Sequence, residues 1–324
     1  MIKFISRHEK DYSRYNIIKN MVKDLATRND VYILFPFSKN QFIKHFFKRD
    51  RIINDFFISN YDTYVYDRKK ITKWNPRAWW KYLQDWINFR FSKYLLSDTY
   101  EHFKYWEELF GPFGGKLFVL PVLADGSIYF PAEKRAINKA PRILFYGSFI
   151  PLHGIDTILK AFKLLEENGS VFEAEIIGNG QTYKSMKQLY DALKLKHVTM
   201  DGELIKEAEL GERIREADIV LGIFGTSTKA KSVVPNKVYQ ALACQKAMVT
   251  MESDALKEFF DESHLLTCTN TPEMLAETLK HLIANPQQIE SLATEGHKRY
   301  NELYSTKKQA FIEYIQEIDA ELEK

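Results

Sequence analysis

Cysteine is scarce in this sequence, because the 324 residues contain only Cys244 and Cys268. Two cysteines cannot form a disulfide framework, so we expect a reducing compartment. The N-terminal segment meets charged residues too early for a secretory signal peptide, and no apolar run approaches the roughly 18 residues of a membrane-spanning helix. These absences predict a cytoplasmic protein.

Motifs for metal ions and for common nucleophiles are also missing. The eight histidines are scattered, no Cys-x-x-Cys occurs, and Asp62, Asp67 and Asp98 lack the spacing of metal ligands. Neither the G-x-S-x-G motif of serine hydrolases nor the phosphate-binding G-x-x-x-x-G-K motif is present. The sequence therefore predicts no metal site and no P-loop.

The residues that are present divide into two parts. The length suits two domains of about 150 residues each, and a composition of 45% hydrophobic and 27% charged residues is globular. Residues 1–140 carry 25 Lys and Arg against 15 Asp and Glu, together with 31 of the 46 aromatic residues. The remainder carries 21 basic against 28 acidic residues. We expect a basic first domain over 1–138, a second domain over 139–305, and a final helix over 306–324 that crosses back to the first domain.

The first half predicts a small parallel sheet. Apolar runs predict strands at 2–5, 31–35 and 51–59, a strand ending at Ser97, and a strand at 116–122. Helical spacing predicts helices over 16–27, after Pro76, and over 100–110, and no strand is expected within 38–50.

The second half alternates strands and helices more regularly. The expected strands are 142–147, 172–178, 197–202, 218–224 and 247–250. The expected helices are 155–168, 186–195, 207–216 and 237–245, with helices alone after residue 250. Such alternation indicates a parallel sheet covered on both faces, with any ligand at the carboxyl ends of the strands.

Glycine follows three of these strands, in the segments 146–154, 177–181 and 224–237. Glycine lets the backbone approach a ligand, and the helix that follows offers free N–H groups and the positive end of its dipole. Each turn alone is weak evidence, since such a glycine is often structural. Together the three turns indicate a site for a nucleotide diphosphate.

The third of these segments is rich in cations. Lys229, Lys231 and Lys237 lie within nine residues, among several hydroxyl side chains, and Pro235–Asn236 falls where a helix would begin. Cations, hydroxyls and helix-terminal N–H groups are what a diphosphate requires. A solvated lysine loop is the alternative interpretation.

Five segments follow one another between residues 142 and 250: YGSFIPLHGIDTILKAF, AEIIGNGQ, HVTMDGEL, EADIVLGIFG and VVPNKVYQALACQKAMVT. In this order they resemble the donor-binding domain of retaining glycosyltransferases of family 4. In the first half, ISRHEKDYSRYN, NYDTYVYDRKK, LLSDTYEHFKYWEELFG and VLPVLADGSIYFP are similar to a bacterial branch of these enzymes. The resemblance implies an α/β protein of GT-B fold, with two Rossmann-like domains whose parallel sheets face a cleft and a first domain reduced in size.

The resemblance also implies the chemistry of the site. It implies a nucleotide-diphosphate sugar as donor, transfer with retention of anomeric configuration, and no metal ion. The residues that it assigns to catalysis are His153, Ser232, Lys237 and Gln240. The donor-binding residues that it implies are Gly147, Ser148, Gly178, Asn179, Gly180, Gly202, Glu203, Thr226, Ser227, Lys229, Lys231, Val233, Val234 and Asn236.

Two features depart from the common pattern of the family. The first donor loop has Ser148–Phe149 and His153–Gly154 where the family commonly has an arginine and a lysine. Ser232 and Gln240 stand where the family has two glutamates that hold the sugar hydroxyls and the ribose. Both residues still accept hydrogen bonds, and the lysines of 224–237 can replace the missing basic pair. These departures leave an inactive homologue as an open alternative.

Several polar residues are candidates for ligand contacts outside the glycine turns. His153 can contact the donor phosphate in either charge state, or it is a polar residue at a helix start. His8 follows the first strand and His102 lies in the helix after Asp98–Thr99, with surface or packing roles as the alternative. The predicted acceptor-binding residues are His8, Arg14, Asp98, Thr99 and His102.

Two stretches of the first half, 42–51 and 74–93, combine aromatic with basic residues. On a membrane surface, their Trp and Phe would lie at the headgroup level and their Lys and Arg would contact anionic lipid. Alternatively, these aromatic residues fill the core of a small domain. Nucleic acid is not expected as a partner, because no recognition motif accompanies the basic residues.

Together these features predict a cytoplasmic enzyme, peripheral on the inner face of the membrane. It is expected to transfer a sugar from a UDP- or GDP-sugar to a glycan or lipid-linked acceptor, in the synthesis of cell-surface polysaccharide or glycoconjugate, with no further cofactor. Two alternatives are a GT-B-fold protein that binds nucleotide sugar without transfer and a sugar-nucleotide epimerase of similar fold.

Overall fold

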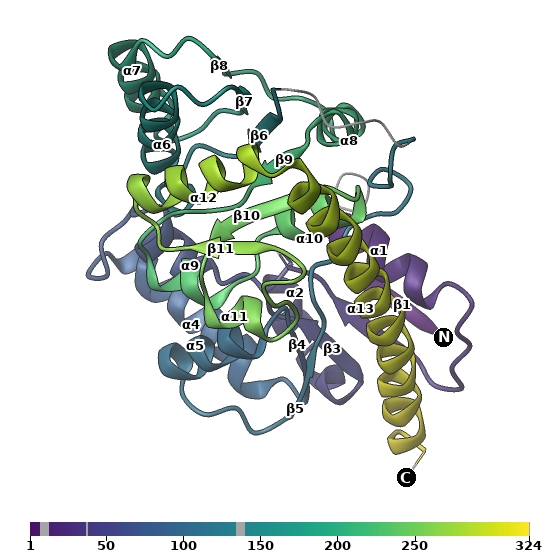
Figure 1. Ribbon diagram of the computed structural model, residues 1–324. Helices are drawn as coiled ribbons and strands as arrows, with labels where there is room; N and C mark the ends of the chain where they lie inside the picture. Colours follow the sequence, from purple (N-terminus) through teal and green to yellow (C-terminus); the bar gives the residue numbers. More distant parts are fainter. Residues whose placement is uncertain (7–12, 37, 134–139, 324) are drawn as a thin grey trace. The chain divides into compact units, whose positions relative to one another are not determined.

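The computed structural model describes residues 1–6, 13–36, 38–133 and 140–323. Internal contacts divide the chain into two compact units. The first unit comprises Met1–Leu123, Ser232–Val234 and Leu303–Lys324, and the second comprises Ala124–Lys231 and Pro235–Glu302. Each unit is an α/β domain built on one parallel sheet (Figure 1). The limits at Leu123 and Glu302 precede the boundaries expected at 138 and 305.

The described part of the first unit contains five parallel strands in the order β1-β2-β3-β4-β5. They are β1 (Ile2–Ile5), β2 (Val31–Leu34), β3 (Ile52–Asp55), β4 (Tyr94–Ser97) and β5 (Lys116–Val119). Each lies at a strand predicted from the sequence. The three inner strands are the most buried, as expected for the middle of a parallel sheet.

Helices of different lengths connect these strands. They are α1 (Ser13–Val22), α2 (Asn40–Lys44), the 3₁₀ segment η1 (Phe46–Arg51), α3 (Asn60–Asp62), the π-helical turn η2 (Thr63–Asp67), α4 (Pro76–Phe91) and α5 (Tyr100–Phe110). Helix α4 begins after Pro76 as predicted, because the Asn75 side chain accepts a hydrogen bond from the Arg77 N–H. The short helices α2 and α3 span less than two turns, too few to show a helical period.

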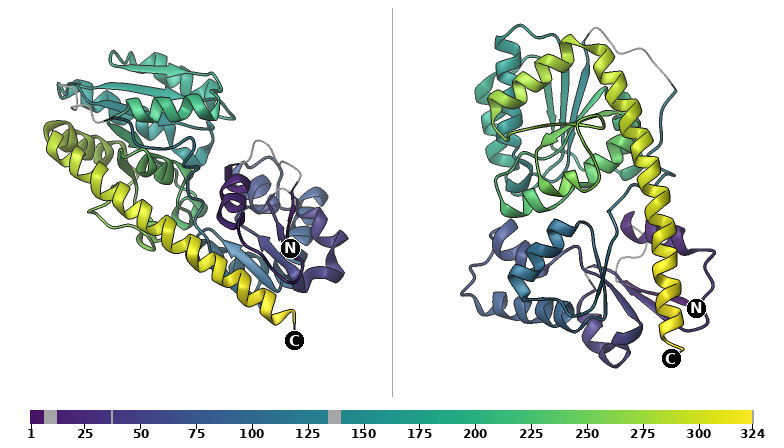
Figure 2. Two further views of the ribbon diagram at one scale, coloured as in Figure 1. Left: turned by 90° about the vertical axis from the view of Figure 1, so that its right-hand side faces the viewer. Right: turned by 60° about the horizontal axis from the view of Figure 1, so that its bottom comes forward.

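Helices cover both faces of the first sheet. Helix α1 packs its Tyr15 against Phe4 on one face, whereas α4 and α5 lie on the other face, where Leu95 packs with Phe89 and Trp106. The opposite face is covered by the C-terminal part of α13 (Pro286–Glu321), which runs along the strands of this unit (Figure 2). There, Phe118 stacks on Tyr314 with ring centroids 5.0 Å apart, and the Tyr314 hydroxyl donates to the Lys116 carbonyl oxygen.

The described part of the second unit contains six parallel strands in the order β11-β10-β9-β6-β7-β8. They are β6 (Arg142–Tyr146), β7 (Glu173–Ile177), β8 (Val198–Asp201), β9 (Ile219–Leu221), β10 (Ala247–Met251) and β11 (Leu266–Cys268). The expectation of helices alone after residue 250 is wrong, because β11 pairs with β10. A strand of three residues is too short to show alternation in the sequence.

The helices of the second unit lie close to those predicted from periodicity. They are the 3₁₀ turn η3 (Pro151–His153), α6 (Ile155–Glu167), α7 (Tyr183–Leu193), α8 (Glu207–Glu216), α9 (Thr228–Ser232), α10 (Asn236–Ala243), α11 (Asp254–Lys257), α12 (Pro272–Ala284) and the first part of α13. Helix α9 spans few residues and was not predicted, for the same reason as β11, whereas α11 lies after residue 250, where helices were expected. None of the helices within the described ranges is long and apolar enough to cross a membrane.

The C-terminal part of α13 is expected to contribute much of the stability of the first unit. Ile315 is fully buried, so replacing it with alanine removes three carbons from a packed interior and leaves a cavity. We expect I315A to lower the free energy of unfolding by about 2–4 kcal/mol in urea denaturation. The neighbouring Gln316 is exposed, and Q316A should change stability by less than about 0.5 kcal/mol. Equal effects of the two substitutions would contradict this packing.

Candidate functional site

The strand order of the second sheet reverses beside β6. From β6 the chain runs outward to β7 and β8, and it then returns to β9 on the other side of β6. The loops that leave β6 and β9 therefore separate, and sheets of this kind bind ligands in the resulting crevice at the carboxyl ends of the strands. These two loops span 147–154 and 222–235, and they carry many of the donor-binding residues predicted from the sequence.

Glycines let these loops approach one another closely. Gly147 has a φ of 137°, and a Cβ atom there would lie 2.9 Å from Lys237 Nζ and 3.0 Å from His153 Cε1. Gly178 has a φ of 133°, and a Cβ atom there would lie 2.1 Å from the Gly147 carbonyl oxygen. Both positions thus require glycine for conformation and for space, and Gly147 leaves room for two candidate ligand-binding side chains.

Lys237 and His153 meet at this edge of the sheet. Lys237 Nζ lies 3.3 Å from His153 Nε2, although the two residues are 84 positions apart in the sequence. The two residues are 6% and 9% exposed. The Lys237 ammonium group also lies 5.1 Å from the centroid of the Phe145 ring and 5.6 Å from that of Tyr146. The structure therefore brings together two of the residues assigned to catalysis.

The contact between these two side chains constrains their protonation. A charged lysine only donates hydrogen bonds, so His153 Nε2 must accept and the imidazole is then neutral. Burial and then the Lys237 charge lower the pKa of His153 well below its ordinary value, while a hydrogen bond with the Ser148 backbone acts in the opposite direction. Burial alone lowers the pKa of Lys237 to about 7. No carboxylate among the described residues forms an ion pair with Lys237, so an anionic ligand would restore the usual pKa of this cation.

Gln240 lies one turn after Lys237 on α10 and is 9% exposed. Its Oε1 accepts a hydrogen bond of 2.7 Å from the Tyr146 hydroxyl. The amide nitrogen of Gln240 remains a donor, and Oε1 retains a second lone pair. The structure therefore places Gln240 beside the Lys237–His153 pair, with its orientation set by Tyr146.

The predicted donor residues after β7 and β8 form a second group at the same edge of the sheet. Asn179 Nδ2 donates to the Gly202 carbonyl oxygen at 2.9 Å, and Asn179 Oδ1 accepts from the Gly180 N–H at 2.7 Å. The Glu203 N–H donates to Asp201 Oδ1. Asn179 thus joins the two turns, and the exposed Glu203 lies at the end of β8.

The predicted donor residues after β9 have different environments. Thr226 is exposed, and Ser227 Oγ accepts from the Ala230 N–H at 3.2 Å. Lys229 is half-buried, and Lys231 lines a cavity of about 260 Å³ together with Glu252 and Asp254.

Five further residues predicted for the site lie before or at the start of α10 or in the loop after β6. Ser232, Val233 and Val234 belong to the first unit, where the Thr99 hydroxyl donates to the Ser232 carbonyl oxygen at 2.7 Å. Asn236 is exposed at the start of α10, and Ser148 is exposed in the loop after β6. The contribution of these residues to donor binding stays a prediction.

The predicted acceptor residues that the structure describes are buried in the first unit. Arg14 Nε and Nη2 donate to the two carboxylate oxygens of Asp55 at 2.6 and 2.8 Å, and Nη1 donates to the Leu120 carbonyl oxygen. The exposed fractions of Arg14 and Asp55 are 2% and 0%. We interpret Arg14 as a support for the end of β3, while His8 lies outside the described residues.

Asp98, Thr99 and His102 form a second buried group, after β4. His102 Nδ1 hydrogen-bonds to Asp98 Oδ1 at 2.6 Å, and the His102 ring lies 4.2 Å from the Trp106 ring, centroid to centroid. Thr99 caps α5 by accepting from the His102 N–H. These bonds fix the start of α5, and acceptor binding by the three residues stays a prediction.

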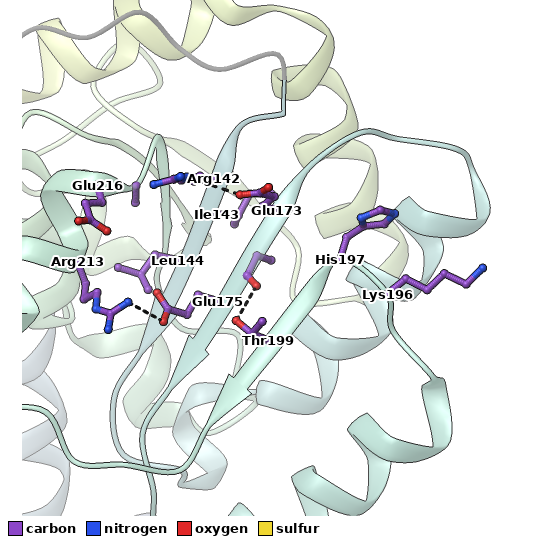
Figure 3. A pocket seen from close by; sticks show the side chains of 12 residues that line it. Arg142, Ile143, Leu144, Glu173, Glu175, Lys196, His197, Thr199, Arg213 and Glu216 are labelled. Carbon is purple, nitrogen blue, oxygen red and sulfur yellow. Dashed lines mark hydrogen bonds and ion pairs between the residues drawn. The ribbon is translucent and has the colours of Figure 1, made fainter.

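A cavity of about 420 Å³ lies at the opposite, amino-terminal end of β6, β7 and β8 (Figure 3). Four of its charged side chains form ion pairs. Arg142 Nε lies 3.6 Å from Glu173 Oε2, and Arg213 Nη1 lies 3.3 Å from Glu175 Oε1. None of the predicted donor residues lines this cavity. The group of residues around Lys237, rather than the 420 Å³ cavity, is therefore the candidate site.

Comparison with known proteins identifies the family. The model of the glycosyl transferases group 1 family matches residues 130–299, which is more than half of the chain. The chain belongs to this family. An uncharacterized glycosyltransferase of Methanocaldococcus jannaschii is 24% identical over 167 residues, which cover 51% of this chain and 44% of that relative. The match therefore spans less than half the length of this curated relative.

Solved structures of low sequence identity share the fold. Sucrose-phosphate synthase of Thermosynechococcus elongatus aligns with a TM-score of 0.69 and 12% identity over 90% of this chain and 74% of that chain. HepE of Anabaena, in complex with UDP and glucose, aligns with a TM-score of 0.66 and 13% identity over 97% and 98% of the two chains. A glycosyltransferase of Rickettsia africae aligns with a TM-score of 0.62 and 12% identity over 98% and 97%. The chain therefore has the GT-B fold predicted from the sequence.

The sequence did not reveal every residue of the candidate site. The rings of Phe145 and Tyr146 lie near the Lys237 ammonium group, and neither was a predicted site residue. Tyr146 directly precedes the first glycine turn, and that position is a signal for a residue near the candidate site. In the first unit, the buried carboxylates Asp55 and Asp85 were also missed, because their burial depends on cations distant in the sequence.

Replacing Lys237 with methionine should stabilise the unliganded protein at neutral pH. The pKa of Lys237 is about 7 when folded and 10.5 ordinarily, so between these values the unfolded chain binds more protons and stability rises with pH. One unit of pKa difference corresponds to about 1.4 kcal/mol. We expect K237M to remove this rise, so that its stability advantage is largest below about pH 7 and shrinks toward pH 10.5. Urea denaturation across this range measures the difference, and a gap independent of pH would refute the assignment.

Proposed function

We propose that this glycosyltransferase moves a sugar from a nucleotide-diphosphate donor to a glycan or lipid-linked acceptor. The observation that carries the proposal is the Lys237–His153 pair, a buried cation with no ion-paired carboxylate among the described residues at the switch point of the second sheet. Family membership supports transfer, and the relative HepE was solved with UDP and glucose. A diphosphate is the anionic group that such a donor would bring to this crevice.

In this proposal, the protein's own cations stabilise the leaving diphosphate. Lys237 donates a charge-assisted hydrogen bond to a phosphate oxygen, and such bonds strengthen where water is excluded. His153, neutral in the unliganded pair, holds the lysine and donates to phosphate when it is protonated. Gly154 is the N-cap of helix α6 and supplies no capping side chain, and the positive end of the helix dipole favours the same anion. No step of this proposal uses a metal ion or a resident cofactor.

Gln240 is proposed to orient the donor rather than to carry charge. In the related enzymes that the sequence resembles, a glutamate at this position holds the donor. Here the amide accepts from the Tyr146 hydroxyl at 2.7 Å and offers N–H donors to a ribose or sugar hydroxyl. A neutral group at this place favours a second candidate function, in which the protein binds nucleotide sugar without transferring it.

The acceptor is proposed to be part of a cell-surface polysaccharide or glycoconjugate under assembly. A lipid-linked acceptor of this kind is held at the inner face of the membrane, and a peripheral cytoplasmic enzyme would reach it there. Support for this comes from the basic and aromatic character of residues 1–140.

The donor role of Lys237 is tested by binding measurements. We expect K237A to weaken the binding of UDP or GDP, whichever binds the wild type, by roughly 10–100-fold, because a charge-assisted hydrogen bond contributes about 1.5–3 kcal/mol. The free nucleoside, which lacks phosphate, should bind both proteins equally. K187A, at an ion-paired lysine on α7, is the matched control. Isothermal calorimetry measures all three, and unchanged diphosphate affinity of folded K237A would exclude this role.

Turnover separates the two candidate functions. We expect release of nucleotide diphosphate from a UDP- or GDP-sugar in the presence of lipid-linked acceptors, at a rate unchanged by EDTA. Loss of this activity with EDTA would contradict the metal-independent chemistry. The second candidate function, nucleotide-sugar binding without transfer, predicts tight nucleotide binding with no turnover for any donor and acceptor pair. It also predicts that Gln240→Glu produces turnover.

A further inference from the structure

Helix α4 (Figure 1) buries two polar side chains and exposes two tryptophans. Its buried side includes Asp85 and Asn88, both 0% exposed, whereas Trp79 and Trp80 are 62% and 63% exposed. Trp74, just before the helix, is 75% exposed. Three tryptophans are thus exposed within seven residues, and soluble proteins seldom present so much exposed apolar surface without a partner.

Hydrogen bonds on the buried side hold the helix in this orientation. Asp85 accepts from the Ser59 hydroxyl at 2.7 Å and lies 3.2 Å from Lys39 Nζ. Asn88 Nδ2 donates to the Lys39 carbonyl oxygen at 3.1 Å. Rotating α4 to bury the tryptophans would break a buried ion pair, which is strongly unfavourable. The tryptophans therefore stay on the outside.

Basic residues surround these tryptophans. The exposed cations from residue 68 onward to the first turns of α4 are Arg68, Lys69, Lys70, Lys73 and Arg77. No Asp or Glu occurs between Arg68 and Gln84, and the flanking Asp67 and Asp85 are buried. Lys73 Nζ lies 5.1 Å from the centroid of the Trp74 ring, so cation and aromatic side chains are interleaved.

This surface differs from the stretches 42–51 and 74–93 expected from the sequence. In 42–51, Phe42 is 0% exposed and packs with Leu34 and Ile52, although Phe47 is 99% exposed. In the second stretch, Phe89 lies in the core. The aromatic residues of the first unit therefore divide between core and surface, and the exposed group begins earlier in the sequence, at Arg68.

An anionic lipid bilayer matches this combination of side chains. Tryptophan rings favour the interface between headgroups and hydrocarbon, where an amphipathic ring contacts both phases. Exposed Lys and Arg are attracted to the negative potential of anionic headgroups. An acidic protein would satisfy the cations, but it would leave three tryptophans to be matched by apolar pockets.

We propose that the exposed side chains of 68–83, which we call the Trp–Lys surface, attach the first unit to membranes rich in anionic phospholipid. The tryptophans enter the headgroup region and the cations contact phosphate groups, which gives reversible, peripheral attachment. This inference does not depend on the donor site, since every residue that carries it belongs to the first unit.

Vesicle flotation of the full chain tests the proposal. We expect binding to vesicles of phosphatidylcholine with phosphatidylglycerol at low salt, weaker binding at high salt, and little binding to phosphatidylcholine alone. Each basic residue near anionic lipid strengthens binding about fivefold, so the triple variant K69E/K70E/K73E should bind at least about 100-fold more weakly. The double variant W79S/W80S should also bind more weakly and lose most of the blue shift in tryptophan fluorescence on vesicle addition.

A matched charge control makes the test specific. Lys184, Lys280 and Lys298 are exposed lysines of the second unit, and reversing all three changes the net charge equally. We expect this control to retain binding, and all variants to bind UDP or GDP like the wild type. Absent wild-type binding, equal binding to neutral vesicles, or equal loss in the control would overturn the proposal. Retention on soluble polyaspartate without vesicle binding would also overturn it, in favour of an acidic protein partner.

Discussion

Burying the Lys237 ammonium group beside His153 and the Phe145 ring is unfavourable in the absence of an anion, because these neighbours solvate a cation poorly. The surrounding sequence preserves this arrangement. Gly147 leaves space for both side chains, η3 brings His153 back beneath the loop, and Tyr146 holds Gln240 one turn beyond the lysine. In our proposal the site is pre-organised for a diphosphate, whose binding free energy would compensate for the instability of the unliganded pair.

Two buried cations of the first unit, unlike Lys237, form ion pairs with carboxylates. Arg14 forms two hydrogen bonds with the Asp55 carboxylate, and Lys39 pairs with Asp85, with both cations about 2% exposed. These pairs lie near the carboxyl ends of β2 and β3 and fix the loops that follow, including the orientation of α4. Paired charges thus shape the first unit, while Lys237, which forms no ion pair with a carboxylate of the described residues, marks the candidate site of the second.

Local sequence patterns account for most elements of both sheets. The buried run 31–35 and the amphipathic helix at 155–168 appear almost as predicted, because each pattern is long enough to show its period. Strand β11 and helices α2 and α9 are too short for this. Helix α4 shows a different limit: its position is readable from Asn75 and Pro76, but its exposed face is not, because distant partners bury Asp85.

Much of the candidate site followed from resemblance rather than from pattern. The sequence alone indicated glycine turns and a lysine-rich segment, and the resemblance singled out Lys237, His153 and Gln240. His153 follows β6 and Lys237 follows β9, so the two side chains come into contact only because these strands are neighbours in the folded sheet. Lys229 is half-buried and Lys231 lines the cavity of about 260 Å³. The sequence could not predict these different environments.

The most direct test of the central claim is the number of protons taken up when nucleotide diphosphate binds. Isothermal calorimetry in buffers of different ionisation enthalpy measures this number. At about pH 8 most of the unliganded Lys237 is neutral, because burial lowers its pKa to about 7, and a bound phosphate should restore the charged form. The account predicts uptake approaching one proton by the wild type and much less by K237M. No uptake by the wild type, or equal uptake by both proteins, would contradict it.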